Sequence, residues 1–328
     1  MTSLSQQADA TETPAAGKGR NLGAMRELAL LAMIAVLIAA MSFASPYFLS
    51  VANFEAMIVG LVPTAIIVVG MTILLVSGSF DLSVGSTLAL SSTIVAILLL
   101  TGYPIPVAIL GALLVGVLVG LCNGLIVTLL RVNPLIATLG TMSVARGVAL
   151  VLTEGFSMTN LPAGFSVFGK LELLGLPLMV WITLAIIVLG DIALRRTRFL
   201  RQAYFIGGNE KAAALSGIAV NRVRVACFVI SGVLSAVAGV LLASRLMSGT
   251  PTAGNAMELQ VLAAAVIGGA SLRGGEGTIF GAALGVIFVA LISNAMTMLA
   301  ISIYWQMIVT GLVLVIAVAI DMLTRRNS

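Results

Sequence analysis

The 328-residue chain contains no histidine and only two cysteines. Without histidine it has no imidazole that could ligate a metal, act as a general base or relay a proton. Cys122 and Cys227 both lie inside apolar runs, where we expect them to be small buried hydrophobes rather than parts of a disulfide framework. The sequence therefore predicts no metal site and no bound cofactor.

Charge is also scarce. Charged residues make up 9% of the sequence, whereas soluble domains usually carry about 25%. Hydrophobic residues make up 60% and the mean hydropathy is +1.18, more than a soluble core of this size could hide from water. Apolar runs of about 20 residues recur along the chain and are typical of membrane-spanning helices, whereas barrel strands would be shorter and alternate in polarity. We expect an all-α, polytopic transmembrane helical bundle.

Motifs for enzyme chemistry are missing as well. The sequence has no G-x-x-x-x-G-K-[ST] phosphate loop, since Gly17-Lys18-Gly19 fails the spacing, and no H-E-x-x-H or G-x-S-x-G motif. We therefore expect a protein that is not an enzyme and does not hydrolyse ATP itself. Its net charge of +5 comes from lysines and arginines scattered between apolar runs, which argues against a nucleic-acid partner.

Ten apolar runs predict about ten spans. Polar residues 1–24 precede them and are expected to form a disordered cytoplasmic tail, with 25–328 forming a single transmembrane domain. The predicted spans are about 27–45, 56–77, 83–101, 105–130, 134–153, 173–194, 222–246, 257–271, 277–299 and 303–323. The eighth is short for a span, so we expect it to be tilted, broken or continuous with its neighbour.

The basic residues predict the orientation. With the N-terminus in the cytoplasm, 14 of the 17 lysines and arginines fall on the cytoplasmic side and only Lys170 falls in an outside loop, while Arg146 and Arg245 lie within or at the edge of spans. Such asymmetry is what the positive-inside rule describes. The fourteen are Lys18, Arg20, Arg26, Arg131, Arg195, Arg196, Arg198, Arg201, Lys211, Arg222, Arg224, Arg273, Arg325 and Arg326. We expect both termini inside the cell.

A few polar residues lie at or inside the spans. Asp81, in a Gly-Ser-rich corner, is expected to cap a helix by accepting from the backbone of Ser83 or Val84, with a direct pathway role as the alternative. Arg146 sits in an apolar run, where a charge costs about 2.5–3.5 kcal/mol on insertion scales. It needs a partner inside the protein, for which Asp81, Glu154 and a backbone carbonyl are candidates, or it contacts the transported substrate.

Other polar residues are expected to join helices or to line a pathway. Asn123 and Asn294 lie mid-span, where an amide more often bonds helix to helix than binds a ligand. The full set assigned to a pathway or structural role is Asp81, Asn123, Arg146, Arg245, Glu258 and Asn294.

The long basic loop about 195–221 contains a helix signature. Asn209 can cap a short helix, Glu210 in the first turn favours the helix dipole, and Gly217 can end it. Between them lies an alanine-rich surface. Such a helix is either an ordinary interfacial helix or a docking element for a cytoplasmic partner.

This loop resembles the coupling loop of bacterial ribose-type sugar permeases, the membrane subunits of ATP-binding cassette (ABC) importers. Three further motifs, in the expected order, are similar to the same family. The residues that carry the resemblance are Gly208-Asn209-Glu210, Ala212-Ala213 and Leu215-Ser216-Gly217-Ile218 in the loop; Phe80-Asp81-Leu82-Ser83-Val84-Gly85-Ser86; Gly120-Leu121-Cys122-Asn123-Gly124-Leu125 with Ile136-Ala137-Thr138-Leu139-Gly140-Thr141-Met142 and Arg146-Gly147; and Ala243-Ser244-Arg245 followed by Glu258-Leu259, Ala263-Ala264, Ile267-Gly268-Gly269, Ser271-Leu272 and Gly274-Gly275. One departure is Gln260-Val261-Leu262, where the family often has Asp-Ala-Ile, so no role for an acid is carried over there.

The resemblance implies a multi-pass permease of the bacterial inner membrane that moves a monosaccharide such as a pentose or hexose. It implies cytoplasmic ATPase subunits docked on the loop, a periplasmic sugar-binding protein, and a second permease copy in a homodimer or heterodimer. The residues implied in coupling to the ATPase are Gly208, Asn209, Glu210, Ala212, Ala213, Ser216 and Gly217.

Three alternatives stay open at this point. One is an ABC permease for nucleosides or branched-chain amino acids, which share a related architecture. Another is a stand-alone secondary carrier, although proton coupling usually uses buried acids or histidines, which are scarce or absent here. The third is a membrane scaffold without transport activity, which would not need a coupling-type loop.

Overall fold

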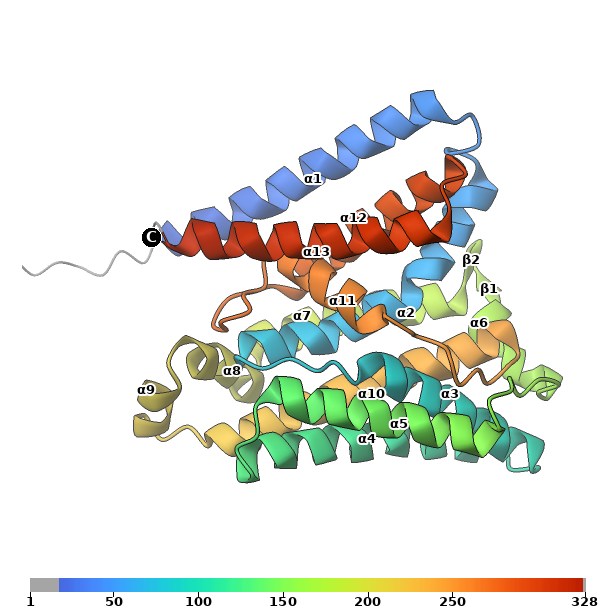
Figure 1. Ribbon diagram of the computed structural model, residues 1–328, viewed down its shortest axis with the longest axis horizontal. Coiled ribbons are helices and arrows are strands. Elements are labelled where there is room, and N and C mark those ends of the chain that lie inside the picture. The colour runs from blue at the N-terminus through green and yellow to red at the C-terminus, as the bar shows by residue number, and fades with distance from the viewer. Residues whose placement is uncertain (1–17, 327–328) are drawn as a thin grey trace, which may run out of the picture.

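The computed structural model describes residues 18–326 and is built almost entirely of helices (Figure 1). The elements are α1 (Lys18–Ala44), α2 (Val51–Val76), α3 (Val84–Leu100), α4 (Ile105–Leu129), α5 (Pro134–Thr153), η1 (Ala163–Ser166), α6 (Val167–Lys170), β1 (Glu172–Leu173), β2 (Leu176–Pro177), α7 (Leu178–Arg196), α8 (Arg198–Gly208), α9 (Glu210–Leu215), α10 (Val220–Leu246), α11 (Met257–Ile267), α12 (Ile279–Met298) and α13 (Ile303–Arg326). The all-α fold class is confirmed.

The long helices agree in position with the apolar runs. Each of the ten predicted spans contains one helix, namely α1 to α5, α7 and α10 to α13. Within the described residues, seven helices are long and apolar enough to cross a membrane: α1, α2, α4, α5, α7, α10 and α12, while α3 and α11 are apolar but shorter. The number of ten crossings and the placement of the termini remain predictions.

Three details differ from the expectations. The tail predicted over 1–24 is helical from Lys18 onward, because α1 extends past its apolar run, and its earlier part lies outside the described residues. The sixth span does not begin at 173, because 172–177 form a β-hairpin whose turn uses Leu174 and Gly175 at positive φ. Cys227 is buried as expected, but Cys122 is exposed on α4.

The core forms around α2 and α10. The spanning window of α2 is 72% buried, and its side chains pack with α3, α7, α10, α11 and α12 in one hydrophobic cluster. Against α10, helix α4 approaches so closely that a Cβ atom added to Gly116, Gly120 or Gly232 would lie closer than 3.0 Å to the facing backbone. Small residues thus allow backbone-to-backbone packing of the kind that drives helix association in lipid.

Helices α3 and α11 begin inside the bundle rather than at its ends (Figure 1). They have 17 and 11 residues, or about 25 and 16 Å at 1.5 Å per residue, shorter than the ~30 Å hydrocarbon core. Non-helical segments 77–83 and 247–256, which consist largely of turns, lead into them, and the two starts meet where Gly85 packs on Gly254. Irregular backbone at this depth is stable only where the protein satisfies its polar groups.

Candidate functional site

Helix α8 lies against one end of the bundle. The hydroxyl of Thr197 accepts a hydrogen bond from the N–H of Leu200 at 3.3 Å and so caps the helix. Leu200, Ala203 and Ile206 are buried at a spacing of three residues, which puts one apolar face on the bundle and leaves Arg198 exposed. The sequence analysis did not predict α8, although apolar residues spaced three apart indicate an amphipathic helix.

Helix α9 stands beyond α8 and matches the predicted capped helix. The side-chain oxygen of Asn209 accepts from the N–H of Ala212 at 3.0 Å. Gly217, with φ +83°, follows the last turn and donates its N–H to Ala214 at 3.0 Å. Because a left-handed residue stops a helix and suits glycine, the start and the end of this helix are both confirmed.

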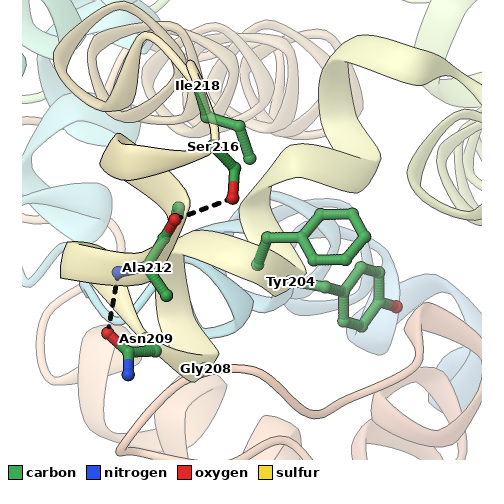
Figure 2. Close-up of a pocket in the computed structure, with 8 residues that line it drawn as sticks. Tyr204, Gly208, Asn209, Ala212, Ser216 and Ile218 are labelled. Carbon is green, nitrogen blue, oxygen red and sulfur yellow. Dashed lines mark hydrogen bonds between the residues drawn. The ribbon is translucent and has the colours of Figure 1, made fainter.

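A concave surface lies between α8 and α9, with a cavity of about 450 Å³. Figure 2 shows the side chains around it, including the Asn209 cap and the hydroxyl of Ser216, which donates to the carbonyl of Ala212 at 2.9 Å. Its lining is mostly apolar: Tyr204, Phe205, Gly208, Asn209, Ala212, Ala213, Ser216 and Ile218. Leu215 at the tip of α9 is 91% exposed. A face of this kind suits a protein partner, because exposed apolar surface beside a rigid helix favours docking.

An ion pair ties α9 to α10. The guanidinium of Arg224 donates to the carboxylate of Glu210 at 2.7 Å. This hydrogen bond lowers the pKa of Glu210 from its ordinary value of 4.5. The pair therefore forms fully above that value and is lost as the pH falls through the lowered pKa. Glu210 is more than half exposed, so the pair orients α9 more than it stabilises the fold.

Four glycines, which we call the glycine joint, bring the α8 end against the bundle: Gly78, Gly207, Gly274 and Gly275. A Cβ atom on Gly207 or Gly274 would lie closer than 3.0 Å to the facing backbone. The N–H of Gly275 donates to the carbonyl of Val76, the last residue of α2, at 2.9 Å. Close packing and tight turns therefore explain these four glycines.

A side chain adds to the joint. The hydroxyl of Tyr204 on α8 donates to the carbonyl of Gly277 at 2.8 Å. Burial raises the pKa of this phenol above its ordinary value of 10.0, so it stays a donor. Segment 274–277 leads directly into α12, so α8 is connected to both α2 and α12.

Asp81 lies deep in the bundle, 1% exposed. Its carboxylate accepts the predicted hydrogen bond from the N–H of Ser83 at 2.8 Å and another from the Ser83 hydroxyl at 2.6 Å. Asp81 does not cap α3 itself, because the N-cap position is Ser83 and no side chain caps the helix there. The amide of Asn123 on α4 donates to it at 3.3 Å and the hydroxyl of Ser231 on α10 at 3.4 Å. Thr141 on α5 donates to the oxygen of Asn123 at 2.6 Å. The network joins the start of α3 to three other helices.

Of its three candidate partners, Arg146 on α5 binds backbone carbonyls. Its Nη1 donates to the carbonyls of Pro251 and Ala253, each at 2.7 Å. It therefore satisfies irregular backbone of the segment before α11. Within the described residues Arg146 pairs with neither Asp81 nor Glu154.

Glu258 lies close to the same place. It is half-buried in the first turn of α11 and interacts electrostatically with Arg146. Its Oε2 packs against Gly85 at the start of α3, 2.9 Å from where a Cβ would stand. The structure thus gathers Arg146, Glu258 and the two helix starts at one point.

The remaining polar residues lie elsewhere. Asn294 on α12 and Asn53 on α2 exchange hydrogen bonds of 2.7 and 3.2 Å, which makes Asn294 a helix-to-helix contact. Arg245 is exposed in the last turn of α10, apart from both groups. The sequence reading missed Asn53, Thr141 and Ser231, because nothing along the chain shows which helix each one faces.

Comparison with known proteins identifies relatives over most of the chain. The family model described as branched-chain amino acid transport system / permease component matches residues 53–318. The ribose import permease of Bacillus subtilis is 41% identical over 91% of this chain and 94% of its own length.

Two arabinose permeases are also similar. The L-arabinose transport system permease of Escherichia coli is 37% identical over 89% of both chains. The L-arabinose ABC transporter permease of Azospirillum brasilense is 33% identical over 97% of this chain and 94% of its own. No solved structure matches significantly.

Proposed function

Since this chain belongs to the family of branched-chain amino acid transport system permease components, we propose that it is the membrane permease of an ATP-driven bacterial importer for a neutral monosaccharide. The similar relatives are ribose and arabinose permeases, which favours a sugar over the amino acid of the family description. It is a multi-pass protein of the inner membrane.

The observation that carries the proposal is the α8–α9 unit. A short, capped helix with an exposed tip stands outside the bundle, beside an apolar cavity of about 450 Å³, and contacts α2 and the segment before α12 through the glycine joint. A carrier working alone has no need of such a unit. An importer needs one, because force from ATP hydrolysis on another chain must reach the membrane helices. The residues proposed to couple are Gly208, Asn209, Glu210, Ala212, Ala213, Ser216 and Gly217.

The topology follows from this assignment. Both termini and the α8–α9 unit lie in the cytoplasm, with ten crossings, residues 1–24 as a cytoplasmic tail and 25–328 as one permease domain. The excess of lysine and arginine on that side supports it. The η1–α6 segment and the hairpin then face the periplasm, where a binding protein delivers the sugar.

The partners are two ATPase subunits, a periplasmic sugar-binding protein and a second permease, identical or related. ATP closes the ATPase subunits, α8 and α9 move with them, and α12 follows through segment 274–277, which leads into it. Sugar then passes through a transient pathway by alternating access. The pathway should hold sugar weakly, because a tight site would trap cargo released by the binding protein.

Reconstitution tests the proposal. The chain, co-expressed with its genomic neighbours, is placed in liposomes, and ATP-dependent uptake of labelled sugars is measured with the binding protein present or omitted. Uptake that needs both ATP and the binding protein is expected. Uptake of sugar that needs neither would overturn the proposal.

Two variants test the coupling role. Glu210→Arg reverses the pair with Arg224, and Gly217→Pro removes an N–H donor at a φ that proline cannot adopt. We expect both to insert normally and to abolish sugar uptake while ATP hydrolysis continues. Normal transport by the two α9-region variants would contradict the coupling role.

A further inference from the structure

We propose that a polar cavity between α2, α11, α12 and α13 is the chamber that receives the sugar during transport, an assignment that rests on the proposed function. The cavity measures about 310 Å³, at the small end of the roughly 300–1,000 Å³ typical of small-molecule sites. The residues on its wall that carry the argument are Gly60, Thr64, Gln260, Ser293, Asn294 and Gln306.

The cavity lies at the end of the bundle opposite α8 and α9. Gly60 lies in the first half of α2 and Thr64 at its middle, while the last residue of α2 contacts the glycine joint. Ser293 lies near the end of α12 and Gln306 at the start of α13, beside the α12–α13 connection. Gln260, close to the inner start of α11, forms the deep part of the wall. In the proposed topology the chamber runs from the periplasmic side to mid-membrane.

Several wall groups lack a partner. Within residues 18–326 the side chains of Thr64, Gln260 and Ser293 make no hydrogen bond, although each lies on a helix of the bundle and is partly buried. Unpaired polar groups at membrane depth are costly. Three such groups from three helices facing one cavity indicate that water or cargo satisfies them.

The polar groups on the cavity wall indicate which class of ligand fits. Its polar groups are amides and hydroxyls, which donate and accept hydrogen bonds without charge, as a polyhydroxylated sugar requires. Among the side chains that the structure describes, none of those lining the cavity is charged. A zwitterionic amino acid would have to bury two charges there without partners, at a large cost in free energy. A neutral monosaccharide is therefore the matching class.

A filling variant tests the site. A Cβ atom at Gly60 would meet nothing within 4 Å, so Gly60→Phe puts a ring into free space without a backbone clash. Gly140 on α5 is also a helical glycine with open space around it, and Gly140→Phe is the matched control. Gln260→Leu removes the amide, and Gln260→Asn keeps it.

The assay uses the reconstituted transporter with its ATPase and its binding protein, and measures sugar uptake and ATP hydrolysis together. We expect Gln260→Leu to lower the maximal uptake rate by about tenfold, as a lost contact worth about 1.4 kcal/mol would. Gly60→Phe should lower it by about as much, because its ring occupies the space that the sugar needs. Stimulation of ATP hydrolysis by the loaded binding protein should stay unchanged. Gly140→Phe should transport normally and Gln260→Asn should recover part of the rate.

The outcomes separate the two proposals. If the wild-type protein shows no uptake dependent on ATP and binding protein, the proposed function fails, and the chamber with it. If the wild-type protein transports and Gly60→Phe and Gln260→Leu do so equally well, only the chamber is overturned. It is also overturned if uptake and ATP hydrolysis fall together, or if both phenylalanine variants lose uptake to the same extent.

Discussion

The contact between α4 and α10 is closely packed, whereas the space enclosed by α2, α11, α12 and α13 holds a cavity. Along α4 and α10 the backbones touch, and a methyl group at Gly116 or Gly232 would find no room. Where α2, α11, α12 and α13 face one another, a cavity of about 310 Å³ remains and is lined by hydroxyls and amides, although α11 and α12 themselves touch where Gly285 meets Ala264.

This difference in packing indicates which helices form a fixed scaffold and which can move. A backbone contact without side chains has one tight arrangement and resists sliding, because packed interiors tolerate little change in volume. Helices that border a cavity can change position at a lower cost, because no close contact has to be broken across the cavity. We infer that α2, α3, α4 and α10 hold the fold while α11, α12 and α13 rearrange.

Enlarging a scaffold glycine should have the largest effect. Gly232→Leu forces a side chain into the carbonyl of Gly116, and we expect a loss of stability of about 3 kcal/mol or more. Thermal unfolding in detergent, followed by size-exclusion chromatography, measures it. Gly140→Leu, in open space, should unfold at the wild-type temperature. Equal stability of both variants would contradict the close packing.

Removing the carboxylate of Asp81, just before α3, should cause the second-largest loss of stability. Asp81→Ala leaves the donors of Ser83, Asn123 and Ser231 without their acceptor, and we expect a cost of about 3 kcal/mol. Asp81→Asn keeps one oxygen acceptor and should lose less in the same unfolding assay. If alanine were tolerated as well as asparagine, the network would not stabilise the scaffold.

Removing the hydrogen bonds that hold segment 247–256, before α11, should lower stability less and affect only that part of the chain. Arg146→Met removes the donor to the carbonyls of Pro251 and Ala253, at a cost of about 2 kcal/mol. Hydrogen–deuterium exchange should rise in 247–256 while α4 and α10 stay protected. Uniform loss of protection over the whole chain would show instead that Arg146 belongs to the scaffold.

The contact between α2 and α12 should be the weakest of the four. A double-mutant cycle with Asn53→Ala and Asn294→Ala should give a coupling energy of about 0.6 kcal/mol, the average for such bonds between membrane helices. Thermal unfolding of the two single variants and the double variant provides it. A coupling energy as large as the Asp81→Ala effect would remove the distinction between the two regions.

The sequence predicts the helices well, because an apolar run in lipid must satisfy its own backbone and only a helix does so locally. The cap at Asn209 is predictable for a similar reason, since its acceptor and donor lie three residues apart. The family likewise follows from motifs that are local along the chain.

The sequence does not predict contacts that depend on which helix a side chain faces. The bond from Ser83 to Asp81 is predictable because it is local, but the other partner, Ser231, is 150 residues away. Arg146 had three candidate partners, and only the path of 247–256 selects the carbonyls. The hairpin at 172–177 was absorbed into a span because Leu173, Leu174 and Leu176 extend the apolar run. Gln260 showed only as a departure from a motif, since its cavity is made by four helices.

The glycine joint has a consequence for protein engineering. Because Gly207 meets Gly274 and Gly78 without side chains between them, the surface that α8 presents to the bundle is shaped by three separate stretches of chain. A chimera that exchanges only 195–221 with a permease from another system would put a foreign backbone against these two glycines. Chimeras should therefore assemble when 76–78 and 274–277 are exchanged together with the loop. The three segments have to be transferred as one unit.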